Sequence, residues 1–202
     1  METSITQVYC ARNNILSILE ETGYDVSEYN NVAIQQVNAM LETNQLDLFL
    51  THKSGKKIFV KFNLDTKLNV KNVVCPFFDE EDPVLTKQDD LMIIVKSDPN
   101  ETIISAMDSL WNDSKIYVSV INIKRLQFNI LKHVQVPKHE ILTEDEKTAL
   151  FLKHHLKKDI DLPLISRYDP VATVLCMRPG MVCKIHRKSK TSITTLYYRA
   201  CV

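Results

Sequence analysis

The stretch Asp169-Pro170-Val171-Ala172 constrains the fold most, because it fixes where a helix begins. An aspartate before proline caps a helix: its carboxylate accepts hydrogen bonds from the first free N–H groups, and proline supplies a pre-set φ where no donor is missed. The turn Arg178-Pro179-Gly180 then delivers the chain into a basic strand, residues 181–187. A second β-rich run, 194–202, follows polar residues 188–192, so the chain is predicted to close on a hairpin.

A second helix start lies upstream, at Thr143-Glu144-Asp145-Glu146. This is a capping box, in which Thr143 caps the helix and Glu146 reaches back to the Thr143 N–H. Acids open this helix and five basic or histidine residues close it, so both ends match the helix dipole. The closing residues are Lys153, His154, His155, Lys157 and Lys158. Pro163 is predicted to end the segment.

These motifs together carry a family resemblance. The last third of the chain resembles the C-terminal assembly domain of the fifth common subunit of eukaryotic RNA polymerases, a domain that archaeal polymerases possess alone as a small separate polypeptide. The matching residues are Val136-Pro137-Lys138-His139, Leu162-Pro163, Asp169-Pro170-Val171-Ala172, Gly180-x-Val182-x-Lys184-Ile185-x-Arg187-x-Ser189-x-Thr191 and Tyr198-Arg199. Their fixed order over about a third of the chain is more specific than any single motif.

The resemblance implies a mixed α/β or α+β architecture with two domains. Residues 1–135 would form a truncated restriction-endonuclease-like jaw domain without a catalytic set, and residues 136–202 the assembly domain. It further implies a non-catalytic subunit of a DNA-directed RNA polymerase. The assembly domain would dock on the largest subunit beside other polymerase subunits, and the jaw would lie near downstream duplex DNA, with no cofactor, metal or membrane involved.

The same resemblance assigns roles to particular residues. The expected partner interface comprises Pro137, Lys138, His139, Pro163, Val171, Lys184, Ile185, Arg187, Tyr198 and Arg199. The expected caps and turns are Thr143, Glu146, Asp169, Pro170 and Gly180. Ser105 and Ala106 stand where the jaw would approach DNA. Lys184 and Arg187 should lie on opposite faces of an exposed hairpin edge that can add to a partner's sheet.

The net charge differs between the two predicted domains. Residues 1–135 carry 13 Lys/Arg and 18 Asp/Glu (13 − 18 = −5), and residues 136–202 carry 12 and 7 (12 − 7 = +5). With few aromatic residues to stack bases in the basic part, an acidic protein partner is favoured over nucleic acid. The five cysteines are odd in number and form no Cys-x-x-Cys pair, which favours reduced thiols inside a cell. No apolar run is long enough for a membrane span, and no secretory leader is evident.

The first 135 residues alternate between helix and strand patterns. Apolar spacing predicts helices at 6–21, ended by Gly23, and at 31–41. Strands are predicted at 46–52 and 58–64, around the turn Lys53-Ser54-Gly55-Lys56, and at 91–95, 116–122 and 126–131. Asp98-Pro99-Asn100-Glu101 predicts a further helix, to about residue 111, with Asp98 as its cap. No function is assigned to the acidic loop Asp79-Glu80-Glu81-Asp82.

A nuclease is an alternative, because the restriction-endonuclease fold cleaves DNA through metals held by carboxylates on adjacent strands. Asp47 and Lys61 fit its pattern, but Phe59 occupies the position that needs a second carboxylate, and a phenyl ring cannot bind Mg²⁺. The side chains of the adjacent residues His154 and His155 point in different directions on a helix, so they cannot bind the same metal ion. The remaining alternative is a stand-alone nucleic-acid-binding or repair protein with an inactive nuclease-like domain.

Some residues depart from the family pattern. Ile193 replaces a glycine and cannot easily adopt positive φ, so the hairpin loop should differ in shape. Cys176 also stands where the family usually has glycine. Such divergence favours a version encoded by a large nucleocytoplasmic DNA virus. The expected location is then the host cytoplasm (the viral factory) and the virion, and the nucleus if the source is cellular.

Overall fold

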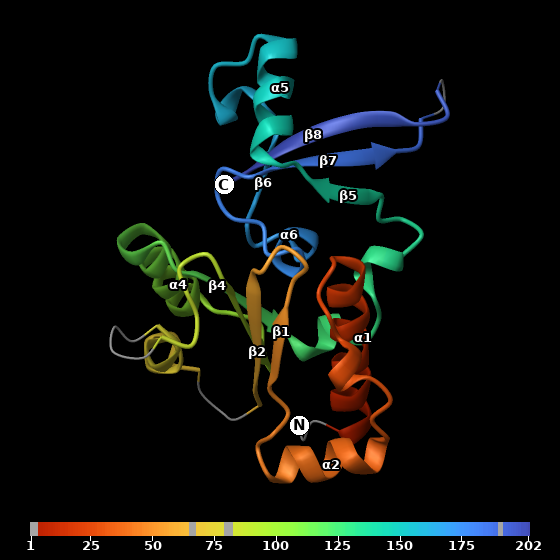
Figure 1. Ribbon diagram of the computed structural model, residues 1–202, viewed down its shortest axis with the longest axis vertical. Helices are drawn as coiled ribbons and strands as arrows, with labels where there is room; N and C mark the ends of the chain where they lie inside the picture. Colours follow the sequence, from red (N-terminus) through yellow and green to blue (C-terminus); the bar gives the residue numbers. More distant parts are fainter. Residues whose placement is uncertain (1–3, 65–67, 79–82, 190–191) are drawn as a thin grey trace. The chain divides into compact units, whose positions relative to one another are not determined.

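The computed structural model describes residues 4–64, 68–78, 83–189 and 192–202 (Figure 1). The acidic loop Asp79-Glu80-Glu81-Asp82 lies outside the described residues, as do two residues of the C-terminal hairpin loop, 190 and 191. The chain divides into two compact units, Met1–Asn129 and Ile130–Val202, called here the N-terminal and C-terminal units. The predicted domain boundary lies after Gln135.

The N-terminal unit opens with two helices and a 3-10 turn between them. Helix α1 (Ile5–Glu21) is capped by Ser4 and buries Val8, Ile15 and Ile18, among others, along one stripe, as the apolar spacing predicted. Gly23 follows it with φ of 100°, which ends the helix. The turn η1 (Ser27–Tyr29) leads to α2 (Ile34–Glu42), which begins three residues later than predicted.

Four strands then build the N-terminal sheet in the order β1-β2-β3-β4. Strands β1 (Leu48–Thr51) and β2 (Lys57–Asn63) form the predicted antiparallel hairpin. Strands β3 (Asp90–Val95) and β4 (Tyr117–Asn122) add in parallel, and every residue of both is buried. Each parallel pair is joined through helical segments: α3 (Val70–Val74) and η2 (Cys75–Phe77) precede β3, and α4 (Glu101–Ser114) precedes β4.

Two predictions for this unit are wrong. Helix α4 is capped by Asn100, whose side chain accepts from the Ile103 N–H, because Asn100 is the residue next to the first helical turn. Asp98 instead pairs with Arg125 at 3.0 Å. The predicted strand 126–131 does not form: the Asn122 side chain accepts from the Lys124 N–H and turns the chain after β4. The residues that follow make two 3-10 turns, η3 (Ile123–Leu126) and η4 (Ile130–Lys132).

The C-terminal unit holds a second mixed sheet, in the order β5-β7-β8-β6. Strands β7 (Val182–Arg187) and β8 (Thr195–Cys201) form the predicted hairpin. Strand β5 (Lys138–Ile141) pairs antiparallel with β7, and the short β6 (Leu164–Ile165) pairs parallel with the end of β8. The two mixed sheets with their helices confirm the α+β class. Besides η4, the helical elements of this unit are α5 (Glu144–His154), η5 (Asp159–Asp161) and α6 (Pro170–Val174).

The predicted caps and turn of this unit are confirmed. Thr143 Oγ1 accepts from the Glu146 N–H, and the Thr143 N–H donates to Glu146 Oε2 at 2.9 Å. Asp169 Oδ1 accepts from the N–H groups of Val171 and Ala172, at 2.9 and 3.4 Å. The turn closes through a 3.0 Å bond from the Met181 N–H to the Arg178 carbonyl.

Cys176 adopts φ of 51°, in the left-handed region that favours glycine. This conformation accounts for a glycine at that position in the family pattern. The thiol side chain is accommodated there and is buried.

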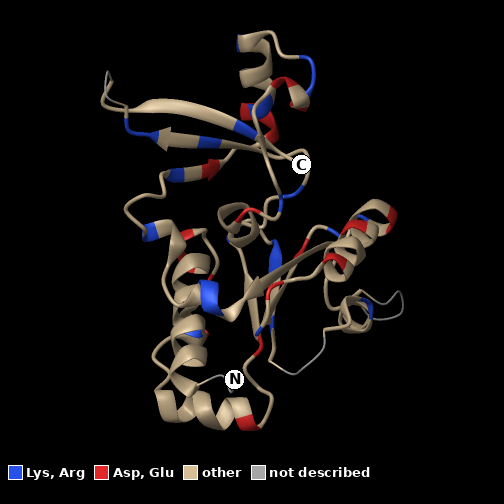
Figure 2. Cartoon of the chain, turned by 180° about the vertical axis from the view of Figure 1, so that it is seen from behind, with Lys and Arg blue, Asp and Glu red and all other residues tan. Residues whose placement is uncertain are grey.

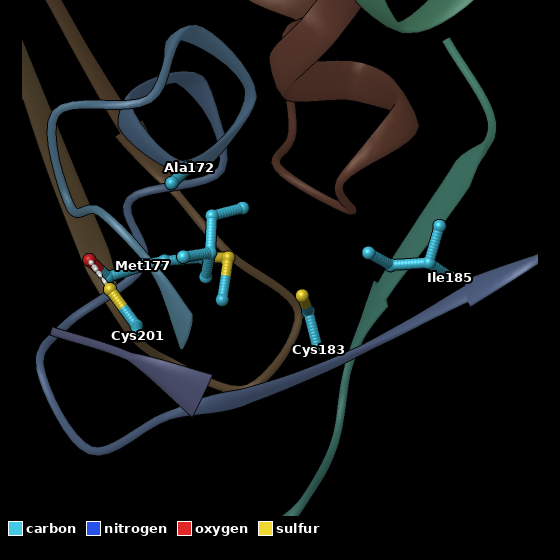
Figure 3. Close-up of a cluster of buried hydrophobic side chains, with 6 residues drawn as sticks. Ala172, Met177, Cys183, Ile185 and Cys201 are labelled. Carbon is cyan, nitrogen blue, oxygen red and sulfur yellow. Dashed lines mark hydrogen bonds between the residues drawn. The ribbon is translucent and has the colours of Figure 1, made fainter. Parts of the chain in front are cut away.

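The two faces of the C-terminal sheet bury separate cores. On one face, α5 contributes Leu150, which packs with Val182 and Ala200. On the other face, α6 and the segment after it cover the sulfur-rich cluster shown in Figure 3, in which the Cys201 thiol donates to the Met177 carbonyl at 3.5 Å. Its members are Ile165, Ala172, Met177, Cys183, Ile185 and Cys201. Alternation along β7 therefore places Lys184 and Arg187 on opposite faces, as predicted.

Candidate partner-binding site

A groove of about 660 Å³ lies on the α6 side of the C-terminal sheet, and we call it the basic groove. Its lining comes from the segment around β5, from β6 and α6, and from the β7–β8 hairpin, all within the C-terminal unit. The lining residues most relevant to binding are Pro137, Lys138, His139, Ile165, Asp169, Val171, Ile185, His186, Arg187, Lys188, Tyr197 and Arg199.

The basic groove combines an apolar floor with a cationic rim. Ile165, Val171 and Ile185 are buried and form the floor. Figure 2 shows basic residues on both β5 and β7, the two strands that flank the groove. Among the described residues that line it, the only acid, Asp169, already caps α6. Such a surface suits a segment that presents carboxylates beside an apolar side chain.

Tyr197 lines the basic groove together with Arg187 and Arg199. Its ring lies beneath two guanidinium groups, with Arg187 at 5.8 Å and Arg199 at 5.7 Å from the ring centroid. Arg199 is held further by a 2.8 Å bond from Nη1 to the Leu164 carbonyl. Aromatic and arginine side chains in such positions commonly dominate binding energy at protein interfaces.

The predicted interface includes Tyr198 and lacks its neighbour Tyr197. Tyr198 packs with the α5 core on the opposite face of the sheet. The alternation of side chains along a strand could have indicated Tyr197. Residues 197 and 199 share a strand face, and Arg199 is among the predicted interface residues.

Glu140, on β5, contacts three basic side chains of β5 and β7. Its carboxylate contacts Lys138 Nζ at 2.6 Å, His186 Nε2 at 3.0 Å and Lys184 Nζ at 3.7 Å. Hydrogen bonds from Lys138 and His186 lower the pKa of Glu140 from 4.5 to about 2. Lys184 therefore has an acidic partner within its own sheet, which makes it less available to another chain than Arg187.

The structure gathers seven of the ten predicted interface residues around the basic groove: Pro137, Lys138, His139, Val171, Ile185, Arg187 and Arg199. Pro163, Lys184 and Tyr198 do not line it. The predicted exposed hairpin edge at β7 is wrong, because β5 pairs with β7 from Cys183 to His186. Strand β5 is not among the predicted strands, and without β5 the strand β7 would lie at the edge of the sheet. A strand of a partner protein therefore cannot pair with β7 where β5 already pairs with it.

The DNA-proximal candidates Ser105 and Ala106 lie on α4 of the N-terminal unit. Ser105 is exposed, and Ala106 is half-buried. Helix α4 carries Glu101, Asp108 and Asp113 and no basic residue, so the helix itself offers little to phosphate groups.

The nuclease-like residues Asp47 and Lys61 line one cavity in the N-terminal unit. Asp47 Oδ1 accepts from the Phe62 N–H at 2.9 Å, and burial raises the pKa of Asp47. Phe59 packs against Phe77, with ring centroids 4.5 Å apart, where a nuclease would present a carboxylate. Within the described ranges, no three His, Cys, Asp or Glu side chains gather as a metal-binding group.

Comparison with known proteins identifies the family. The model of the family described as RNA polymerase Rpb5, C-terminal domain, matches residues 128–201. The subunit Rpo5 of the DNA-directed RNA polymerase of Pyrococcus abyssi is 45% identical over 76 residues, which cover 38% of this chain and 92% of the archaeal protein. The chain belongs to the Rpb5 family of RNA polymerase subunits. Every residue that lines the basic groove lies inside the range matched by the Rpb5 model.

The N-terminal unit of this Rpb5 family member also has relatives. Subunit RPABC1 of the RNA polymerases I, II and III of Caenorhabditis briggsae is 26% identical over 222 residues, covering 100% of this chain and 98% of the nematode protein. Subunit 5B of the RNA polymerases IV and V of Arabidopsis thaliana is 28% identical, covering 95% of this chain and 88% of the plant protein. In the described part of the chain, no helix is long and apolar enough to cross a bilayer.

Proposed function

We propose that this chain is a non-catalytic structural subunit of a multisubunit DNA-directed RNA polymerase. The observation that carries the proposal is the 45% identity to an archaeal polymerase subunit over 92% of its length. Relatives that cover the whole chain are likewise named as polymerase subunits, which disfavours a stand-alone nucleic-acid-binding or repair protein. By this proposal the chain works inside cells, in a nucleus if the source is cellular and in a viral factory and virion if the source is viral.

The C-terminal unit supplies the docking surface in this proposal, as the assembly domain of residues 136–202. Its basic groove binds the largest polymerase subunit, through a segment that carries acidic residues next to an apolar side chain. The buried floor of Ile165, Val171 and Ile185 receives the apolar side chain, and Arg187 and Arg199 pair with the acids. Arg187 and Arg199 are pre-positioned over Tyr197, so little side-chain entropy is lost on binding.

The N-terminal unit acts as the jaw domain, residues 1–135, near downstream duplex DNA. The sequence of a hairpin, a parallel β3, helix α4 and a parallel β4 supports a truncated restriction-endonuclease-like fold. The acidic character of α4 argues that Ser105 and Ala106 approach DNA without forming strong phosphate contacts.

Affinity purification of the tagged chain from its source, followed by mass spectrometry, tests the proposal. We expect two very large polymerase subunits in the purified material, and a lone chain would overturn the proposal. Arg187→Glu combined with Arg199→Glu should lower the recovered large subunits about tenfold, as expected for two central interface arginines. Lys153→Glu combined with Lys157→Glu makes the same charge change on exposed residues outside the groove and should leave recovery unchanged.

A further inference from the structure

One face of β2 carries two lysine side chains, a phenyl ring and an amide side chain. Lys57, Phe59, Lys61 and Asn63 are separated by two residues each, so their side chains project from the same side of the strand. On the opposite face, Ile58 and Val60 are completely buried in the core and Phe62 is half-buried.

Three aromatic rings form a row across this face. The Phe49 and Phe59 centroids are 6.2 Å apart, and those of Phe59 and Phe77 are 4.5 Å apart. The row therefore runs from β1 across β2 to the turn η2. Phe49 is 37% exposed, and Phe59 and Phe77 are half-buried, so the rings are only partly covered by the protein.

Two lysines stand over the ends of the ring row. Lys57 Nζ lies 5.7 Å from the Phe49 ring centroid, and Lys61 Nζ lies 5.3 Å from that of Phe77. We call Phe49, Lys57, Phe59, Lys61 and Phe77 the aromatic-lysine face.

A cavity of about 470 Å³ continues from this face at Lys61. It lies where the parallel strands β2 and β3 end, the edge of an open α/β sheet at which ligands commonly bind. Lys61, Lys96 and the amides of Asn44 and Asn63 line it, together with Asp47, which is already bonded to the Phe62 N–H.

We propose that the aromatic-lysine face binds single-stranded nucleic acid, a role beyond assembly into a polymerase. Unpaired bases stack on the partly exposed rings and displace the Lys57 and Lys61 ammonium groups from above Phe49 and Phe77, and these two lysines and Lys96 then neutralise the backbone phosphates. A row of rings flanked by cations is the combination that sequence-tolerant single-strand binders use. A duplex fits this face poorly, because its bases are stacked on each other and unavailable to the rings.

Fluorescence anisotropy of the full-length chain with a short labelled oligothymidylate tests this proposal. Phe49→Ala should weaken binding about tenfold with an unchanged salt dependence, since it removes stacking alone. Phe49→Trp should retain binding, which separates loss of the ring from loss of the fold. Lys57→Gln with Lys61→Gln should make the slope of log affinity against log salt shallower by about 1.4, because each single-strand phosphate contact contributes about 0.7.

Lys53→Gln with Lys124→Gln is the matched control, because both lysines are exposed and lie in the same unit off the aromatic-lysine face. It should keep the wild-type salt slope. The proposal is overturned if the oligothymidylate does not bind, if a duplex of the same length binds as tightly, or if the control variant changes the slope as much as the Lys57 and Lys61 pair. None of these results depends on whether the chain assembles into a polymerase.

Discussion

Glu140 and His186 join β5 to β7 through a 3.0 Å contact between Glu140 Oε2 and His186 Nε2. The two residues are 46 positions apart in the sequence. Their contact secures the strand pairing that makes β7 an interior strand, and it holds one wall of the basic groove, which His186 lines.

The first prediction concerns the pH dependence of stability. Because the folded-state pKa of Glu140 is about 2, below its ordinary 4.5, its ionised form stabilises the fold. That stabilisation is fully present above pH 4.5 and is lost as the pH falls toward 2. Glu140→Gln should therefore lower Tm at neutral pH and flatten its fall between these pH values. Thermal melts followed by circular dichroism measure this, and exposed Glu20→Gln should melt like the wild type throughout.

The second prediction concerns the cap of α6. Asp169→Ala should destabilise the C-terminal unit by about 1 kcal/mol, because the N–H groups of Val171 and Ala172 lose their acceptor. Asp169→Asn keeps an acceptor oxygen and should retain most of the stability. Urea unfolding followed by far-ultraviolet circular dichroism compares the variants. Equal damage from Ala and Asn would show that charge, rather than capping, is what the site requires.

The third prediction concerns thiol reactivity. Burial raises the pKa of Cys201 to about 11 and also raises that of Cys183, so neither forms a thiolate readily. Cys75 is exposed and should be alkylated first by iodoacetamide at mildly alkaline pH. Peptide mass spectrometry over time should find Cys183 and Cys201 modified only after denaturation. Modification of Cys201 in the folded protein as fast as Cys75 would contradict the buried sulfur cluster.

The fourth prediction concerns Tyr197 in the basic groove. Tyr197→Phe keeps the ring beneath Arg187 and Arg199 and should preserve co-purification of the large polymerase subunits. Tyr197→Leu removes the ring and should reduce recovery several-fold, since the two guanidinium groups lose their support. Matching melting curves for the two variants would assign the loss to binding. If Leu and Phe behave alike, the ring has no part in the interface.

Local residue patterns are sufficient to specify the elements whose causes lie within a few residues. The caps at Thr143 and Asp169, the turn before Met181 and the two hairpins depend on residues a few positions apart, so backbone chemistry alone specifies them. The buried β3 is equally evident from its continuous apolar run. The wrong choice of Asp98 as the cap of α4 also has a local cause. Asn100 can cap a helix equally well, and it lies directly before the first helical residue.

Which strands become neighbours, and which side chains share a surface, depends on long-range packing. The pairing of β5 with β7 and the packing of Phe59 against Phe77 join residues distant in the sequence, and the place of Tyr197 beneath Arg187 depends on the pairing of β7 with β8. No short-range rule specifies such contacts. They follow from burying the apolar faces of whole strands at once, and this long-range packing creates both of the surfaces for which binding is proposed.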